Sequence, residues 1–161
     1  MPKAPARSKE SVILQPRLVL GWREWLGLPT LGLPSIRSKI DSGARSSALH
    51  VDSLEVITVG NTERVAFALD PDNAGTPVRC EADIIDRRPV TDSGGHTCER
   101  IFIRTDLLIA GHLLSIEINL TSRRNMLFPM LLGRTAMAGR CIVDPAASFL
   151  LGERRSSESS S

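Results

Sequence analysis

Tyrosine is absent from this chain of 161 residues, and aromatic residues of all kinds make up only 4% of it. Lysine is scarce too, because only Lys3, Lys9 and Lys39 contribute to the 20 basic residues and arginine supplies the rest. No basic run is interleaved with aromatic residues, the pattern that proteins use to stack on exposed bases. With a formal net charge of only +2, the composition indicates no nucleic-acid partner.

Cysteines and long apolar runs are also few. Cys80, Cys98 and Cys141 are odd in number and widely spaced, so a reducing compartment is favoured over a disulfide framework. No apolar run approaches the roughly 20 residues that a membrane-spanning helix needs. The apolar stretch at 12–20 is broken by polar residues and a proline, unlike the core of a signal peptide. We expect a cytoplasmic protein without a membrane partner.

Motifs for nucleotides and metals are missing. No Gly-x-x-x-x-Gly-Lys-[Ser/Thr] segment occurs, so ATP binding has no support. The histidines His50, His96 and His112 are dispersed, and the sequence has neither His-Glu-x-x-His nor Cys-x-x-Cys spacing. We expect no metal and no cofactor, with a zinc site assembled from distant residues as a less favoured alternative.

The chain does have enough apolar residues for one core. Hydrophobic residues make up 42% of the 161, and this length is typical of a single domain. Both ends are polar, and the C-terminal end is rich in serine. We expect a flexible N-terminal segment at residues 1–15, a folded domain at 16–152 and a disordered tail at 153–161.

Between these ends, apolar residues recur with a period of two, as in strands. The strongest signal is the alternation of Leu114, Ile116, Ile118 and Leu120 with polar residues. These short strands predict an all-β protein, built as a closed barrel or a sandwich. Other strands are expected at 18–20, 36–40, 54–59, 65–69, 78–86 and 100–108, with a hairpin turn at 60–61, pairing of the last two strands, and a short helix at 134–138.

An acid stands where the strand at 36–40 ends, in the segment Asp41-Ser42-Gly43-Ala44. A carboxylate at the end of a buried strand must accept hydrogen bonds or share a proton. Gly43 lets the backbone turn so that its N–H comes near the acid, and the Ser42 hydroxyl can join the same network. Asp41 is therefore the candidate catalytic residue, although Asp-Ser-Gly by itself is also an ordinary turn.

A second motif, Met130-Leu131-Leu132-Gly133-Arg134, lies far downstream. Retroviral-type proteases, the retropepsins, carry an Asp-[Thr/Ser]-Gly-Ala loop and an apolar-apolar-Gly-Arg segment in this order. With Gly21-Trp22-Arg23-Glu24-Trp25 and the segments 39–50 and 126–144, the chain resembles bacterial retropepsin-like proteins often labelled "ATP-dependent zinc protease". The resemblance covers roughly residues 17–151. Members of this family often accompany a ligase that adds glutamates to a ribosomal protein.

The resemblance implies a closed acid-protease (retropepsin-like) barrel with one short C-terminal helix and one lobe per chain. Aspartic proteases hydrolyse peptides with two close carboxylates that share a proton. Only Asp41 stands in Asp-Ser-Gly-Ala after an apolar strand, because Asp92-Ser93-Gly94 lies in a polar stretch and Asp144 lacks the glycine turn. We therefore expect a homodimer in which Asp41 faces Asp41 of a second copy.

The same resemblance implies a flap over the substrate and a support for the active-site loop. The glycine-rich stretch at 91–97, with Ser93, Gly94 and Gly95, is expected to be a flap that closes over the substrate and contacts it. The alternative is an ordinary exposed hairpin turn. Gly133 and Arg134 are expected to support the active-site loop, Arg134 through a charge-assisted hydrogen bond.

Arg45 stands where retroviral enzymes have an acid, two residues after Gly43. It is either a cation that recognises acidic side chains of the substrate or a plain surface arginine. Ser46 and Ser47, which follow it, are further expected substrate contacts. The resemblance thus implies an aspartic endopeptidase for peptides or proteins, with glutamate-rich or glutamylated tails as the suggested substrate. The alternatives are a non-catalytic module that grips an extended peptide and, less favoured, a zinc-dependent peptidase.

Overall fold

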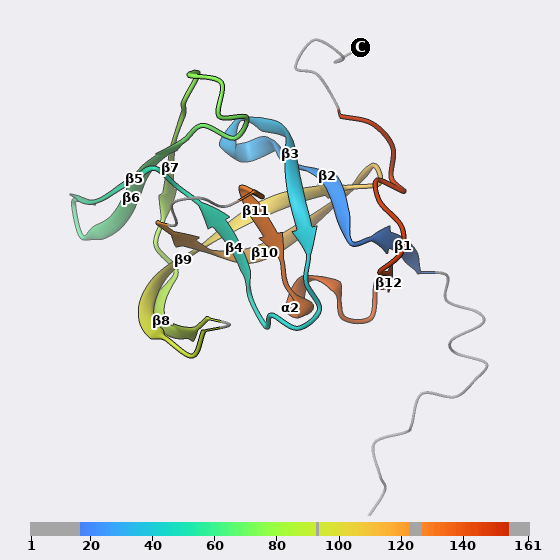
Figure 1. Cartoon of the computed structure of the whole chain (residues 1–161). Coiled ribbons are helices and arrows are strands. Elements are labelled where there is room, and N and C mark those ends of the chain that lie inside the picture. Colours follow the sequence, from blue (N-terminus) through green and yellow to red (C-terminus); the bar gives the residue numbers. More distant parts are fainter. Residues whose placement is uncertain (1–16, 93, 123–126, 155–161) are drawn as a thin grey trace, which may run out of the picture.

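The computed structural model describes residues 17–92, 94–122 and 127–154. These residues form twelve strands, one 3-10 turn and one short helix (Figure 1), which confirms the all-β class. The helix α2 (Arg134–Met137) lies where a helix was expected. None of the helices in the described ranges is long and apolar enough to cross a membrane. The segment expected to be flexible, 1–15, and the tail from 155 onwards lie outside the described residues.

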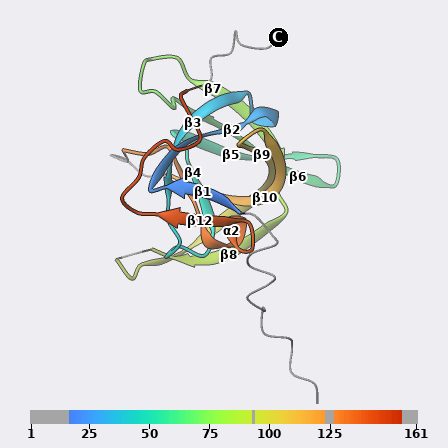
Figure 2. The ribbon, with the colours of Figure 1, turned by 90° about the vertical axis from the view of Figure 1, so that its right-hand side faces the viewer.

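Six strands pair in a ring, into which Figure 2 looks. The order β10–β4–β11–β3–β2–β9 returns to β10 through an antiparallel ladder between β9 and β10. One seam is weak, because β2 and β9 pair only at Gly27 and Leu108, so the expected barrel is less regular than an ideal one. The ring consists of β2 (Arg23–Leu28), β3 (Leu33–Ile40), β4 (Ser47–His50), β9 (Thr97–Ile109), β10 (His112–Thr121) and β11 (Met130–Leu132).

Further elements flank this ring. Strand β8 (Asp86–Thr91) pairs with β9 and forms a hairpin with it, and the 3-10 turn η1 (Pro29–Leu31) joins β2 to β3. A parallel pair is made by β1 (Leu18–Gly21) and β12 (Cys141–Asp144). A separate antiparallel sheet, which projects from the ring in Figure 1, consists of β5 (Ser53–Val59), β6 (Thr62–Leu69) and β7 (Val78–Asp83).

Strand β3 leads to Asp41 and has an alternating sequence. Ile36 and Ser38 are 0% exposed and Ile40 is 6% exposed, whereas Lys39 is exposed. Successive residues of a strand point to opposite faces, so β3 sends its apolar side chains into the barrel. The strand then ends where the barrel meets the surface, and Asp41 is the next residue.

The strand expected at 78–86, paired with 100–108, is wrong in part. It ends at Asp83, and β7 pairs with β6 in the outer sheet. The chain crosses to the ring at Ile84 and Ile85, whose N–H groups donate to Glu63 O and Phe102 O at 3.2 and 2.9 Å. The partner of β9 in this region is β8. Residues on both sides of the crossing favour strands, so the sequence does not mark the change of sheet.

Glu24 is a fully buried carboxylate on β2. It accepts hydrogen bonds from the N–H groups of Gly21 at 2.6 Å, Leu150 at 3.0 Å and Leu151 at 3.0 Å. A buried carboxylate is stable only with such donors. Through these hydrogen bonds, Glu24 holds the segment after β12, at Leu150 and Leu151, against the barrel.

Candidate active site

Asp41 is held by backbone groups at the end of β3. Its own N–H donates to Leu132 O at 2.9 Å, which continues the parallel pairing between β3 and β11. Its Oδ1 accepts hydrogen bonds from the N–H groups of Gly43 at 3.0 Å and Ala44 at 3.2 Å. The side chain is half-buried, so the carboxylate is fixed in direction while remaining accessible.

A side chain at position 43 would crowd the Asp41 carboxylate. A Cβ atom at position 43 would lie 3.2 Å from Asp41 Oδ1, closer than ordinary van der Waals contact. Ser42 and Gly43 are both exposed. The turn therefore presents backbone and a small hydroxyl side chain beside the acid.

The first turn of α2 is bonded to the loop of residues 41–46, the candidate active-site loop. Arg134 N–H donates to Ala44 O at 2.7 Å, and Thr135 N–H donates to Arg45 O at 3.1 Å. The Arg134 guanidinium donates through Nη1 to Ser42 O at 3.1 Å. Three hydrogen bonds from α2 thus reach the loop that carries Asp41.

Gly133 lets α2 approach this closely. A Cβ atom at position 133 would lie 2.5 Å from the carbonyl carbon and oxygen of Ser46 and 2.9 Å from Ser47 N. The backbone of Gly133 is extended, with φ −94° and ψ 174°, so glycine is needed for space and not for a special φ. Its N–H donates to Ser47 Oγ at 3.0 Å.

Ser47 is placed differently from expectation. Its side chain is fully buried beneath the loop, where the hydroxyl accepts the hydrogen bond from Gly133. The Ser47 carbonyl accepts a further bond from Asn119 Nδ2 at 2.9 Å. Ser47 therefore supports the loop and does not face a substrate, because the strand alternation of β4 turns it inward.

Asp41 opens onto a cleft of about 410 Å³. The cleft lies between the active-site loop and the β8–β9 hairpin, which occupy the same end of the molecule in Figure 1. The volume is within the range of small-ligand sites. Its lining includes Asp41, Gly43, Ala44 and Ser46 from the loop, Val90, Thr91 and Asp92 from the hairpin, and Arg100, Asn119 and Thr121 from β9 and β10.

The hairpin turn is organised by Asp92. Its Oδ1 accepts hydrogen bonds from the N–H groups of Gly94 and His96, both at 2.9 Å. Gly95 has φ +84°, a conformation that favours glycine. Gly94 and Gly95 are exposed and do not line the cleft, and Ser93 lies outside the described residues. The hairpin residues that line the cleft are Val90, Thr91 and Asp92.

Arg100 is a cleft residue that the sequence reasoning missed. It stands directly opposite Arg88 in the β8–β9 ladder, an unfavourable arrangement for like charges. Its Nη1 donates to Thr121 Oγ1, while its buried Nε has no hydrogen-bond partner among the described residues. The alternation of Arg100, Phe102 and Arg104 along β9 is the signal that places these side chains on one face.

Asp144 and Asp92 accept hydrogen bonds in turns of their own. Asp144, in β12, uses Oδ1 to accept a hydrogen bond from Ala146 N–H at 2.9 Å, and it does not line the Asp41 cleft. Asp92 lines the cleft and holds the turn of the β8–β9 hairpin, as Asp41 holds the turn after β3. Within the described ranges, no three His, Cys, Asp or Glu side chains are grouped to hold a metal ion.

Known proteins are similar to this chain in sequence or in fold. A probable alpha-L-glutamate ligase of Shewanella halifaxensis is 36% identical over 144 residues, which is 88% of this chain and 31% of that protein. The corresponding protein of Desulfotalea psychrophila is 39% identical over 137 residues, 84% of this chain and 30% of that protein. The chain therefore spans about a third of the length of these relatives.

A crystal structure of a Legionella pneumophila protein of unknown function superimposes with a TM-score of 0.71 at 23% identity. The match covers 84% of this chain and 99% of the other, which shows a common fold. The sequence model of the RimB-like family, described as retropepsin-like aspartic endopeptidase RimB, matches residues 19–154. That segment contains the Asp41 loop, the β8–β9 hairpin and the Gly133–Arg134 support, and the chain belongs to the RimB-like family of retropepsin-like aspartic endopeptidases.

Proposed function

We propose that two copies of this chain form a homodimeric aspartic endopeptidase in which the two Asp41 carboxylates meet. The observation that carries this proposal is the Asp41 cleft, in which one carboxylate, that of Asp41, stands on the Asp-Ser-Gly-Ala loop at the end of β3. Asp92, the other acid that lines the cleft, lies in the β8–β9 hairpin on the opposite wall, where its Oδ1 also lies 3.7 Å from His96 Nδ1. A twofold axis beside the exposed Ser42–Gly43 turn supplies the missing acid by symmetry.

The chemistry of such a pair follows from its charge. Two adjacent carboxylates cannot both ionise, so they share one proton. The ionised carboxylate takes a proton from a water molecule, whose oxygen forms a bond to the peptide carbonyl carbon, while the other carboxylic acid protonates the carbonyl oxygen. The C–N bond then breaks, the nitrogen leaves with a proton, and a carboxylic acid and an amine are released. One water is consumed for each bond.

The surrounding residues have positioning roles in this scheme. The N–H groups of Gly43 and Ala44 fix the Asp41 carboxylate. Arg134 and Gly133 hold the loop in place by donating hydrogen bonds to Ser42 O and Ser47 Oγ. The β8–β9 hairpin forms the opposite wall of the cleft, where it can exclude water and keep a peptide extended.

The substrate we propose is a glutamate-rich or glutamylated protein segment, cleaved in the cytoplasm. Relatives named probable alpha-L-glutamate ligase contain a region similar to this chain within a polypeptide about three times as long. A peptidase joined to a ligase is well placed to act on the ligase's product. Three free cysteines, with Cys98 exposed, suit a reducing compartment.

A peptide assay with Asp41→Asn tests this function. Asn keeps the shape of Asp but cannot take or give the proton, so hydrolysis of a glutamate-rich peptide should be lost while the dimer stays folded. A chelator should leave the wild type active. Full activity of Asp41→Asn would refute the aspartic mechanism, and loss of activity with a chelator, restored by zinc, would favour a zinc peptidase. Tight peptide binding without any cleavage by the wild type would indicate a binding module.

A further inference from the structure

The β8–β9 hairpin, which forms one wall of the Asp41 cleft, leaves the barrel at a defined point on β9. Residues 97–102 of β9 pair with β8, and residues 101–109 pair with β10. The two ladders overlap only at Ile101 and Phe102. A two-stranded hairpin has little stability of its own. The angle between the hairpin and the barrel therefore depends on side-chain contacts across this junction.

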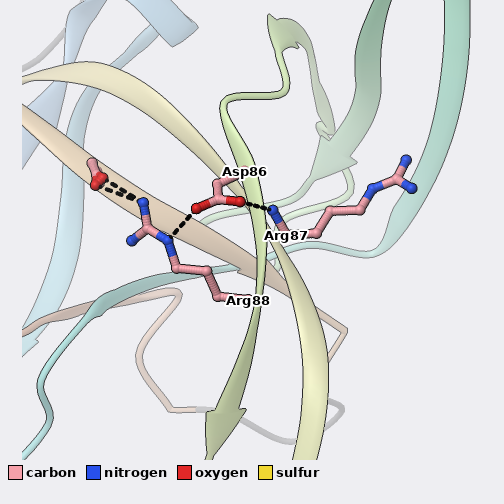
Figure 3. Close-up of polar contacts among 4 residues, drawn as sticks. Asp86, Arg87 and Arg88 are labelled. Carbon is pink, nitrogen blue, oxygen red and sulfur yellow. Dashed lines mark hydrogen bonds and ion pairs between the residues drawn. The ribbon is translucent and has the colours of Figure 1, made fainter.

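Arg88 provides such a contact from β8. Its side chain crosses β9 over the Phe102 ring, with the guanidinium carbon 4.5 Å from the ring centroid. On the far side, Nη2 donates to both carboxylate oxygens of Glu117 on β10 at 3.0 Å, and Nε donates to Asp86 Oδ2 at 2.7 Å (Figure 3). We call Asp86, Arg88 and Glu117 the hairpin clamp. The clamp joins the hairpin to the barrel across the junction.

The clamp is an electrostatic contact near the surface. Its hydrogen bonds to Glu117 and then to Asp86 raise the pKa of the Arg88 guanidinium above its usual value. The side chains of Arg88 and Glu117 are 41% and 30% exposed, so water and salt screen their attraction. The clamp therefore adds little to the stability of the whole fold, and its main effect is on where the hairpin lies.

The clamp also separates two arginines. Arg88 and Arg100 stand directly opposite each other in the β8–β9 ladder, where like charges repel. Glu117 draws the Arg88 guanidinium toward Phe102 and β10. Arg100 donates through Nη1 to Thr121 Oγ1, and both of these residues line the Asp41 cleft. The clamp is thereby linked to a side chain inside the cleft.

Arg87, the neighbour of Arg88, makes a contact on the other face of β8. Its Nη2 donates to Glu63 Oε2 at 3.2 Å on β6 of the outer sheet. Successive residues of a strand point to opposite faces, and Figure 3 shows the two arginines directed away from each other. Val90, on the same face as Arg88, lines the Asp41 cleft. The Arg87–Glu63 contact therefore lies on the face away from the cleft and does not cross β9 to β10.

We propose that the hairpin clamp fixes the angle of the β8–β9 hairpin to the barrel and so sets the width of the Asp41 cleft, with Arg88 and Glu117 as positioning residues. With the clamp closed, residues 90–92 form the wall opposite the active-site loop. When it is broken, the hairpin turns away about residues 101–102 and a peptide loses contacts along that wall. The loop of Asp41 is not touched, so binding is weakened more than the chemical step.

Distances between two spin labels test the hairpin position without any substrate. One label is attached to Cys98, the exposed thiol of the hairpin. The other is attached to a Leu113→Cys variant, because Leu113 is an exposed residue near the start of β10. The half-buried Cys141 is removed as Cys141→Ser, and an excess of unlabelled chain restricts the measurement to label pairs within one chain.

Glu117→Gln should shift or broaden this distance distribution by roughly 2 Å or more, because the amide loses the charge and one acceptor oxygen. Glu63→Gln is the matched control, since it breaks the ion pair of the neighbouring arginine on the same strand. Its distribution should match that of the unchanged background. An identical distribution for Glu117→Gln would overturn the proposal.

Steady-state kinetics on a glutamate-rich peptide give the second readout, which rests on the peptidase proposed above. Glu117→Gln should raise KM about threefold and leave kcat within a factor of two, as expected for a partly exposed ion pair. Loss of a negative charge near an acidic peptide would by itself lower KM, so a rise identifies the clamp. In 1 M salt the ratio of the two KM values should fall toward one.

Glu63→Gln should leave both kinetic constants unchanged. Equal effects of Glu117→Gln and Glu63→Gln, or a fall in kcat with KM unchanged, would overturn the proposal. A wild type that cleaves no peptide would instead refute the proposed function, and the spin-label distances would still decide whether the clamp holds the hairpin.

Discussion

Gly133→Ala is the change that most sharply tests how the active-site loop is supported. The added Cβ would lie 2.5 Å from the carbonyl carbon and oxygen of Ser46, where ordinary contact begins at 3.4 Å. These are backbone atoms and cannot rotate away, so the loop or α2 must move by roughly 1 Å. The movement strains the bonds from Arg134 N to Ala44 O and from Gly133 N to Ser47 Oγ.

We expect Gly133→Ala to lower the free energy of unfolding by about 1–3 kcal/mol, as other overpacked sites do. Activity should fall further, by about a hundredfold in kcat/KM, because a 1 Å displacement of a catalytic group has effects of that order. The free energy is measured by urea unfolding. The kcat/KM is measured on a glutamate-rich peptide, at protein concentrations that would keep the proposed dimer assembled.

Gly60→Ala is the control for this experiment. Gly60 has φ +63° in the β5–β6 turn, and a Cβ there would meet nothing within 4 Å. Gly60→Ala should therefore lower the free energy of unfolding by roughly 1–2 kcal/mol, through backbone conformation alone. The change lies far from the active site. Gly60→Ala should lose stability and keep its activity. If Gly133→Ala keeps full activity, or if both variants lose activity equally, the proposed support of the loop is wrong.

Two other predictions concern stability and thiol chemistry. Glu24→Gln should lower the free energy of unfolding by about 2–3 kcal/mol, because a buried charged acceptor of three N–H groups is replaced by an amide that presents its own donors; an unchanged urea midpoint would contradict this. Burial raises the pKa of Cys80 to about 11 and that of Cys141 above its usual value, so a thiol reagent at pH 8 should modify the exposed Cys98 first and Cys80 only after unfolding. Mass spectrometry of labelled peptides gives the order, and rapid labelling of Cys80 in the folded protein would show that it is not protected.

The parts of the fold that depend on local alternation could be predicted from the sequence. The pattern of Ile36, Ser38 and Ile40 predicts a strand that ends directly before Asp41, and the structure has a strand there, β3, which begins earlier, at Leu33. The alternation at 114–120 likewise lies within β10, and the turn at Gly60 joins β5 to β6. Each of these features is encoded by residues that are neighbours in the chain.

Features that depend on distant neighbours could not be predicted in the same way. Glu24 meets N–H groups that are 126 and 127 residues away, and Gly133 is needed because Ser46 lies against it. The inward placement of Ser47 and the opposition of Arg88 and Arg100 depend on strand register, which is set by pairing and not by composition. The crossing from β7 to β8 has the same cause.

The central claim is that each active site needs Asp41 from two chains, and mixing wild type with Asp41→Asn tests it directly. Equal amounts of the two proteins are allowed to exchange subunits, and hydrolysis is compared with that of the same total amount of wild type. If the acids are shared, only dimers with two wild-type chains are active, and about one quarter of the activity should remain. About one half remaining would mean that each chain works alone, which would contradict the shared pair.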